Sequence, residues 1–201
     1  MSPHPVSGTP AAGLDTTATN RLMDYFDHHD QVWLFGYGSL LYKAGFPWLE
    51  CRPAAIRGWT RRFWQGSHDH RGTPEAPGRV ATLVPEEGAL CDGMAYLITP
   101  AVFDQLDIRE KNGYLRFVTE LYFDDGARAE GLVYIATEEN EAWLGPASDH
   151  EIARRIADSA GPSGPNRDYL LHLAETLRAL GHVDEHVFAL ERALLDIERS
   201  S

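Results

Sequence analysis

Short apolar runs separated by turn residues fill the middle of the chain. Six stretches are rich in β-branched or aromatic residues and are bounded by glycine, proline or acidic turn residues, which is the pattern of β-strands. They cover residues 32–40, 54–64, 78–85, 91–98, 114–123 and 130–136. The first begins as an apolar run and breaks at a glycine, so we expect a buried strand that runs into a turn.

Helical spacing replaces the strand pattern near the end of the chain. Residues 148–160, 166–180 and 184–198 carry apolar side chains three and four positions apart, and each stretch starts with Ser, Asn or Asp. These three residue types are common N-caps, so three terminal helices are predicted. Strands first and helices last indicate an α+β fold, in which a closed or nearly closed sheet carries helices on its outside. The mouth of such a barrel is a place where ligands bind.

One further helix is predicted between the fourth and fifth strand stretches. It runs from Pro100 to about Lys111, with Thr99 as its N-cap and the proline in its first turn. Asn112 and Gly113 then end it.

The amino-terminal segment has a different composition. Its first twenty residues are rich in Pro, Ser, Thr, Ala and Gly and hold almost no large apolar side chains, so they predict a flexible arm. We assign residues 1–30 to this arm and residues 31–201 to a single domain. The arm lacks the basic start and apolar stretch of a secretory signal, and no segment approaches the length of a membrane span. A cytoplasmic protein without a membrane partner is therefore predicted.

Composition and charge narrow the function classes. Hydrophobic residues at 43% and charged residues at 24% fit a globular protein. A formal net charge of -12 repels a phosphate backbone and argues against nucleic-acid binding. Yet six arginines fall between Arg52 and Arg79, and this local basic bias favours a small anionic ligand. Cys51 and Cys91 lack the spacing of a disulfide framework or zinc site and are expected to be small core residues.

Glu110 continues the apolar stripe of the predicted short helix. It lies four residues after Leu106 and seven after Phe103, so it should face inward. Burial and the negative end of the helix dipole both disfavour the charged form of this carboxyl group. A carboxyl group in such an environment is a candidate for proton transfer. Arg109 and Lys111 lie to either side, where they can meet the terminal carbonyls or solvent. The alternative is a solvated glutamate in a last helical turn.

The stretch FGYGSL places Gly36 and Gly38 on either side of Tyr37. Glycines here let the backbone approach a ligand and direct N–H groups at a carboxylate or an oxyanion. A simple strand-end turn or bulge explains the same pattern. Ser39 does not lie in a G-x-S-x-G nucleophile motif, and the spacing of a dinucleotide or Walker loop is absent.

Two other stretches have structural explanations beside functional ones. His68, Asp69 and His70 suggest a metal, but adjacent ligands on one short loop do not complete a site, so no metal is predicted. The GPSGP sequence before Asn166 could bind an anion, but a helix stop followed by an N-cap also explains it.

Aromatic side chains interleave with the arginines of the second strand stretch. They could stack nucleic-acid bases, whereas alternation along one barrel strand makes them core residues. We expect core positions for Trp59, Phe63 and Trp64.

Five motifs taken together resemble the ChaC-type γ-glutamylcyclotransferases, which act on glutathione. The motifs are VWLFGYGSL, RRFWQGSHDHRG, PGRVATLV, REKNGY and GPSGPNRDYL, in the order and spacing of that family, and the resemblance covers about Val32 to Leu194. It implies a small mixed β-barrel of the γ-glutamylcyclotransferase type with attached helices and a C-terminal helical segment. It also implies a lyase that needs no cofactor and converts glutathione to 5-oxoproline and cysteinylglycine.

The resemblance also implies site residues. The substrate loop of the family falls on Tyr37, Gly38, Ser39 and Leu40, and its catalytic glutamate falls on Glu110. The α-amine of the γ-glutamyl group can attack its own γ-carbonyl, so a five-membered ring closes without an enzyme nucleophile. Glu110 would then act as general base and general acid.

The local basic bias supplies a weaker expectation. Arg62 or Arg79 could bind the glycine carboxylate of glutathione. The chain departs from the family at His68, Asn112 and Tyr42, where Thr, Gly and Trp are more frequent. These departures leave a catalytically silent glutathione-binding module as an alternative. A cyclotransferase for other γ-glutamyl amines or amino acids is a second alternative, and RNA binding through the arginine and aromatic segment is a third. The sequence predicts no oligomeric state.

Overall fold

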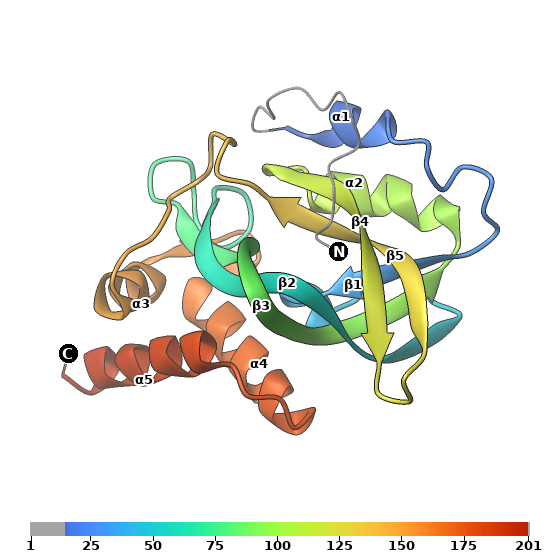
Figure 1. Cartoon of the computed structure of the whole chain (residues 1–201). Coiled ribbons are helices and arrows are strands. Elements are labelled where there is room, and N and C mark those ends of the chain that lie inside the picture. Colours follow the sequence, from blue (N-terminus) through green and yellow to red (C-terminus); the bar gives the residue numbers. More distant parts are fainter. Residues whose placement is uncertain (1–14, 201) are drawn as a thin grey trace. The chain divides into compact units, whose positions relative to one another are not determined.

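Five strands form a closed barrel. The computed structural model describes residues 15–200, and Figure 1 shows the elements along that part of the chain. The barrel order is β1-β3-β2-β4-β5. β1 pairs antiparallel with β3 and parallel with β5. The barrel is therefore mixed in strand direction. Together with the helices, it confirms the predicted α+β fold. The strands are β1 Val32–Gly36, β2 Glu50–Ser67, β3 Gly78–Ile98, β4 Tyr114–Phe123 and β5 Arg128–Ala136.

One strand prediction was wrong. Residues 78–85 and 91–98 were expected to be two strands, because Glu86, Glu87 and Gly88 resemble a turn, but both belong to the single strand β3. Glu86 and Glu87 are exposed, so the acidic side chains stay in water while the backbone remains extended. Gly88 has a φ of 78° and absorbs a local distortion of the strand.

The described residues divide into two compact units. Unit 1 takes in residues up to Thr60 and Leu83–Glu141, and unit 2 takes in Arg61–Thr82 and the residues from Ala142 onward. The long strands β2 and β3 contribute to both units. The single domain expected over residues 31–201 stays a prediction.

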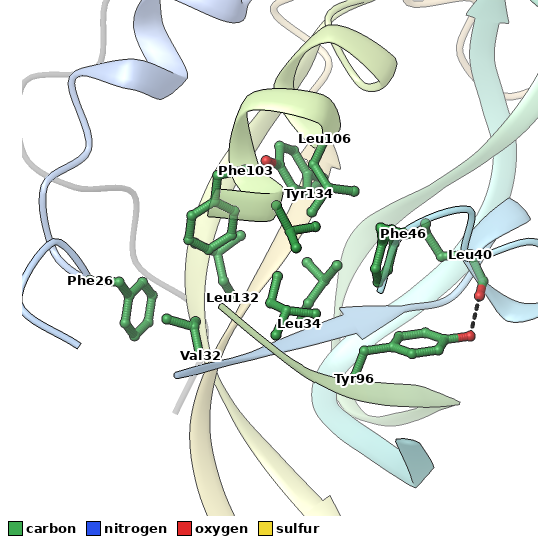
Figure 2. Packing of buried hydrophobic residues seen from close by; sticks show 12 residues of the cluster. Phe26, Val32, Leu34, Leu40, Phe46, Tyr96, Phe103, Leu106, Leu132 and Tyr134 are labelled. Carbon is green, nitrogen blue, oxygen red and sulfur yellow. Dashed lines mark hydrogen bonds between the residues drawn. The ribbon is translucent and has the colours of Figure 1, made fainter. Parts of the chain in front are cut away.

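Unit 1 contains a hydrophobic cluster that joins the strands to a short helix, and Figure 2 shows its side chains. The helix begins as the 3-10 turn η2 Pro100–Val102 and continues as α2 Phe103–Arg109. Leu106 of α2 is fully buried, which contributes about 1.5 to 3 kcal/mol. The cluster consists of Phe26, Val32, Leu34, Leu40, Phe46, Tyr96, Ile98, Val102, Phe103, Leu106, Leu132 and Tyr134.

The start of this helix differs from the expected cap. Thr99 occupies the N-cap position in extended backbone, but its side chain makes no capping hydrogen bond. Pro100 follows in the first turn as predicted. Glu110 is the C-cap of α2.

Part of the expected amino-terminal arm is ordered structure. Residues 1–14 lie outside the described residues, but α1 Thr17–Arg21 is a short helix. Thr16 and Asn20 are buried, and Phe26 joins the hydrophobic cluster. The composition of this segment hides the structure because Thr16 and Asn20, which are buried at α1, are polar and are satisfied by hydrogen bonds to distant backbone.

Unit 2 contains the three predicted terminal helices, α3 Asp149–Asp158, α4 Asn166–Ala179 and α5 Glu185–Arg199. Ser148 and Glu151 form a capping box at the start of α3, and the side chain of Asp184 accepts from the N–H of Val187 at the start of α5. Two-residue strands, β6 Ala160–Gly161 and β7 Gly164–Pro165, form a small hairpin before α4.

Asn166 does not cap α4 as expected. Pro165 occupies the N-cap position, and the buried Asn166 side chain binds the backbone of Arg79 in β3. Its Oδ1 accepts from the Arg79 N–H at 2.7 Å, and its Nδ2 donates to the Arg79 carbonyl at 2.9 Å. The residue therefore joins a helix start to a strand within unit 2.

Neither Cys51 nor Cys91 forms a disulfide, and Cys91 is buried while Cys51 is partly buried. Trp59 and Phe63 are buried, as expected of core aromatics, whereas Trp64 is only partly buried and contacts Trp143 edge to face. Within residues 15–200, no helix is long and apolar enough to cross a membrane.

Candidate active site

A tight turn follows β1 at the glycine loop, which we define as residues 36–40. A Cβ atom on Gly36 would lie 2.6 Å from Cβ of Leu40, so only glycine allows this close approach. The 3-10 turn η1 Ser39–Leu41 comes next, and the N–H of Leu41 donates to the Gly38 carbonyl at 3.0 Å. The loop is therefore a compact structure rather than a loose connection.

Two tyrosines fix the glycine loop to the barrel strands. The hydroxyl of Tyr37 donates to the carbonyl of Tyr134 in β5 at 2.7 Å. The hydroxyl of Tyr96 in β3 donates to the Leu40 carbonyl at 2.5 Å, drawn as a dashed line in Figure 2. Burial raises the pKa of Tyr96 to about 12, with the nearby Cys51 adding to the shift. Tyr96 thus keeps its proton and remains a donor near neutral pH.

Glu110 lies at the end of α2 with its side chain largely withdrawn from water. Only 15% of the side chain is exposed, as the helical spacing predicts for an inward-facing residue. Its N–H donates to the Leu106 carbonyl at 2.8 Å, which holds the residue in the last helical turn. The solvated alternative is thereby disfavoured.

Arg109 links Glu110 to the chain just after β1. Its Nη2 donates to Ser39 Oγ at 3.0 Å and to the Lys43 carbonyl at 2.8 Å, and its Nη1 donates to the Ala44 carbonyl at 2.5 Å. Its Nε lies 3.5 Å from Oε1 of Glu110. One guanidinium therefore brings together the two stretches that the sequence singled out.

The sequence analysis missed this role of Arg109, because it placed the side chain at the carbonyls of its own helix or in solvent. A planar five-donor group beside a candidate carboxylate is a signal that could have indicated a second partner.

A buried polar cluster, which we call the Asp107 cluster, lies beneath α2. The carboxylate of Asp107 accepts from Arg116 Nε at 3.0 Å, from Arg116 Nη2 at 2.5 Å and from the Tyr134 hydroxyl at 2.7 Å. The guanidinium of Arg116 also lies 4.4 Å from the ring centre of Phe103. Burial raises the pKa of Tyr134 well above its usual value. The cluster fixes α2 to β4 and β5, three residues before Glu110.

The sequence analysis did not single out the Asp107 cluster. Asp107 lies in the same helical stripe as Phe103, Leu106 and Glu110. A charged residue at such an inward position requires a buried partner, which is the signal that could have found it.

The two candidate arginines belong to unit 2. Arg79 is buried, and its Nη1 donates to the carbonyls of Phe63 and Gly145 at 3.0 and 2.7 Å. Arg62 is partly buried, and its Nη1 donates to the Arg61 carbonyl at 2.9 Å. Arg79 thus has an evident structural role in unit 2, and its binding of a substrate carboxylate stays a prediction, as does that of Arg62.

Two arginines of the basic stretch are already paired with carboxylates. Arg52 pairs with Asp125 at 2.6 Å in unit 1, and Arg61 forms a buried ion pair with Asp184 in unit 2. The arginine count along the sequence therefore overstated the positive charge open to a ligand.

The loop that carries His68, Asp69 and His70 is joined to the β6–β7 hairpin, because His70 Nδ1 lies 3.0 Å from Ser163 Oγ. Across the part of the chain that the structure describes, no group of three or more His, Cys, Asp or Glu side chains could hold a metal ion. A surface hollow of about 380 Å³ lies in unit 2 beside α3, but it contains none of the predicted site residues.

Comparison with known proteins adds independent information. The model of the ChaC-like protein family matches residues 32–196. Gamma-glutamylcyclotransferase 2-3 of Arabidopsis thaliana is 46% identical over 168 residues, which cover 78% of this chain and 84% of that protein. Glutathione-specific gamma-glutamylcyclotransferase 1 of Danio rerio is 42% identical over 175 residues, covering 82% and 89%.

A solved structure is similar over nearly the same length. The crystal structure of the selenomethionine-labelled γ-glutamylcyclotransferase specific to glutathione from yeast superposes with a TM-score of 0.78 at 32% identity. The similarity covers 84% of this chain and 97% of the yeast chain. Sequence and fold therefore lead to the same group of proteins.

Proposed function

The chain belongs to the ChaC-like protein family, and from this membership we propose that it is a γ-glutamylcyclotransferase that cleaves glutathione to 5-oxoproline and cysteinylglycine. The observation that carries the proposal is the position of Glu110. Its carboxylate is largely buried at the end of α2, and Arg109 links it to Ser39 of the glycine loop. The family match and the named relatives support the choice of substrate.

The reaction needs no nucleophile from the enzyme. The α-amine of the γ-glutamyl group attacks the γ-carbonyl carbon, so a carbon–nitrogen bond forms and closes the five-membered ring. The bond from that carbon to the cysteine nitrogen breaks, and cysteinylglycine leaves. Holding amine and carbonyl in attack geometry supplies as much as about 7 to 11 kcal/mol, so a folded substrate is the main requirement.

Glu110 moves the proton in this scheme. Its carboxylate takes a proton from the α-ammonium and returns it to the departing cysteine nitrogen, so one side chain serves as base and then as acid. Partial burial suits this role, because a carboxylate withdrawn from water is available to a substrate amine rather than to solvent.

The glycine loop binds the substrate in this proposal. Backbone N–H groups from Gly38 to Leu40 face the α-carboxylate or the developing oxyanion, a role worth about 3 to 4 kcal/mol per donor in other enzymes. Tyr37 and Tyr96 hold the loop in place through their hydrogen bonds to Tyr134 and Leu40. A preformed loop loses little entropy when the substrate binds.

The glycine end of glutathione would bind a positive charge. Arg62 and Arg79 both stay candidates for this contact. We expect Arg62→Gln to raise KM for glutathione while kcat stays unchanged. A cytoplasmic location, independence from nucleic acid and the lack of a cofactor stay predictions of the sequence.

The test is a product assay. The protein is incubated with glutathione, and 5-oxoproline and cysteinylglycine are measured. Glu110→Gln keeps the shape of the side chain but removes the base, and we expect turnover to fall by about 10² to 10⁴. Glu87→Gln, at an exposed position in β3, is the matched control. Equal turnover of Glu110→Gln and the wild type would reject the proposed mechanism.

A competition assay separates the substrate alternatives. Glutathione competes with γ-glutamyl dipeptides and γ-glutamylamines in one mixture, and the product ratios give the relative kcat/KM values. Tight binding of glutathione without any product would instead favour a silent binding module.

A further inference from the structure

The segment just after Glu110 is held by residues from the amino-terminal part of the chain. The N–H of Thr16 donates to the Lys111 carbonyl at 2.9 Å, and the Thr16 hydroxyl lies 2.7 Å from the Tyr114 carbonyl. Asp15 and Asn112 form an antiparallel bridge. The residues directly after Glu110 connect α2 to β4. Their backbone is held by hydrogen bonds from the amino-terminal segment.

A second contact lies one helical turn further along α1. Nδ2 of Asn20 donates to the Tyr114 carbonyl at 2.9 Å, and its Oδ1 accepts from the Arg116 N–H at 3.0 Å. The side-chain amide therefore occupies the donor and acceptor positions that a neighbouring strand would otherwise fill at the start of β4. We call Thr16 and Asn20 the amino-terminal clamp.

The clamp is buried and well anchored. Thr16 is fully buried, and Asn20 is 2% exposed. Buried polar groups that are fully paired hold one geometry, since any rearrangement would leave an unsatisfied carbonyl or amide out of water. Phe26, a few residues beyond α1, belongs to the same hydrophobic cluster as Val32 and Phe103 (Figure 2). The segment is therefore attached at two places.

The turn that the clamp holds is a sensitive one. Gly113 has a φ of 89°, and its N–H donates to the same Lys111 carbonyl that accepts from Thr16. The chain reverses there from the end of α2 into β4. Movement of this turn would be transmitted to Glu110, because the glutamate is the cap residue between the helix and the turn.

The clamp lies outside the part of the chain that the family model matches, which begins at residue 32. We infer that Thr16 and Asn20 are positioning residues, which hold the turn after α2 so that the Glu110 carboxylate stays in line with the glycine loop. The inference rests on the proposed role of Glu110. The chain thus supplies from its amino-terminal segment a support that the matched region does not contain.

Kinetics of clamp variants test the inference. The double variant Thr16→Val, Asn20→Ala removes the side-chain hydrogen bonds of both clamp residues. We expect kcat for glutathione to fall between about tenfold and a hundredfold, because small misplacements of catalytic groups lower the rate by such factors. KM should change less than twofold, because the glycine loop is untouched. Thr16→Ser keeps the hydroxyl and should retain wild-type kcat. Thr19→Val, on the same helix, is the matched control.

Truncation provides a second test that does not depend on side-chain replacement. Removal of residues 1–14 keeps the clamp and should leave kcat unchanged, whereas removal of residues 1–21 should lower kcat as the double variant does. Circular dichroism establishes that each variant is folded. Hydrogen exchange at the Arg116 amide, which donates to Asn20, should become faster in the double variant.

The outcomes separate this inference from the proposed function. Suppose that the wild type turns over glutathione and Glu110→Gln does not. If the folded double variant then keeps wild-type kcat, the role of the clamp is rejected while the proposed function stands. A fall in stability without a fall in kcat also overturns it, because that result describes a purely structural segment. If the wild type forms no product, both fail.

Discussion

Arg109 donates a hydrogen bond from Nη2 to the hydroxyl oxygen of Ser39 at 3.0 Å, across seventy positions of sequence. The same guanidinium has its Nε 3.5 Å from the Glu110 carboxylate. One side chain thus sets the spacing between the candidate base and the loop that would hold the substrate. The planar fork of arginine suits this role, because several donors point in fixed directions.

We predict that Arg109→Lys lowers kcat/KM for glutathione at least about tenfold, since each hydrogen bond from a charged group contributes about 1.5 to 3 kcal/mol and one ammonium replaces several. Steady-state kinetics measure the effect. Lys43→Gln is the control, because Arg109 contacts the carbonyl of Lys43 and not its exposed side chain. Equal kcat/KM for Arg109→Lys and the wild type would contradict the prediction.

Asp107→Asn should destabilise the protein strongly. The substitution removes the carboxylate charge next to the guanidinium of Arg116, whose side chain is only 7% exposed. Breaking a buried ion pair from one side costs about 3 to 5 kcal/mol. Urea denaturation measures the free energy of unfolding. Asp104→Asn, exposed on the same helix, should change it by less than about 0.5 kcal/mol. A similar small change for Asp107→Asn would show that the ion pair contributes little.

Tyr96→Phe removes the donor that binds the Leu40 carbonyl. The carbonyl loses its buried partner, and we expect a loss of about 1 to 3 kcal/mol in stability together with a higher KM for glutathione. Thermal unfolding and steady-state kinetics provide the two readouts. Tyr25→Phe removes a hydroxyl that binds Glu130 at an exposed site and should affect neither quantity. An unchanged KM would mean that Tyr96 does not hold the loop for substrate.

His186 should make the protein less stable in acid. Burial, aided by the positive charge of Arg62, lowers its pKa from 6.5 to about 4, while Asp184 and Asp149 oppose the shift. The unfolded state therefore binds more protons than the folded state between about pH 6.5 and 4. The stability from a neutral His186 is complete above the unfolded pKa and is lost as pH falls through this window.

The size of this effect is about 3 kcal/mol across the window. Nε2 of His186 accepts from the Phe63 N–H at 3.0 Å, and a glutamine carbonyl can accept in its place. We predict that His186→Gln loses less stability than the wild type between pH 6.5 and 4.5. Urea denaturation at both pH values measures the difference, and equal losses in the two proteins would exclude His186 as the titrating group.

Local patterns predicted most of the fold. The terminal helices follow from apolar spacing and from caps such as Ser148 and Asp184, which act within a few residues. The strands follow from β-branched and aromatic runs. The separate strands expected on either side of Gly88 failed, because an exposed acidic stretch can stay extended when the strand continues beyond it.

The candidate site was predicted only in part. Glu110 and the glycine loop followed from helical spacing, glycine placement and the family resemblance. Arg109, Asp107 and the clamp were missed, because their partners lie far away in sequence. The Thr16 hydroxyl, for example, binds Tyr114 across 98 positions, and no local pattern encodes such a pairing. The segment around Thr16 and Asn20 therefore has the composition of a flexible arm, although its side chains bind the backbone of a distant strand.

The parallel pairing of β1 with β5 has a consequence for how the chain folds during synthesis. Leu34 pairs with Leu132 there, so the barrel cannot close until β5, its last strand in the sequence, has been synthesised. Until β5 has left the ribosome, one side of β1 offers unpaired backbone groups to any passing strand, and non-local pairing of this kind forms slowly. Pairing with β5 removes the exposed edge of β1. The risk of aggregation is therefore greater during synthesis than in the folded protein.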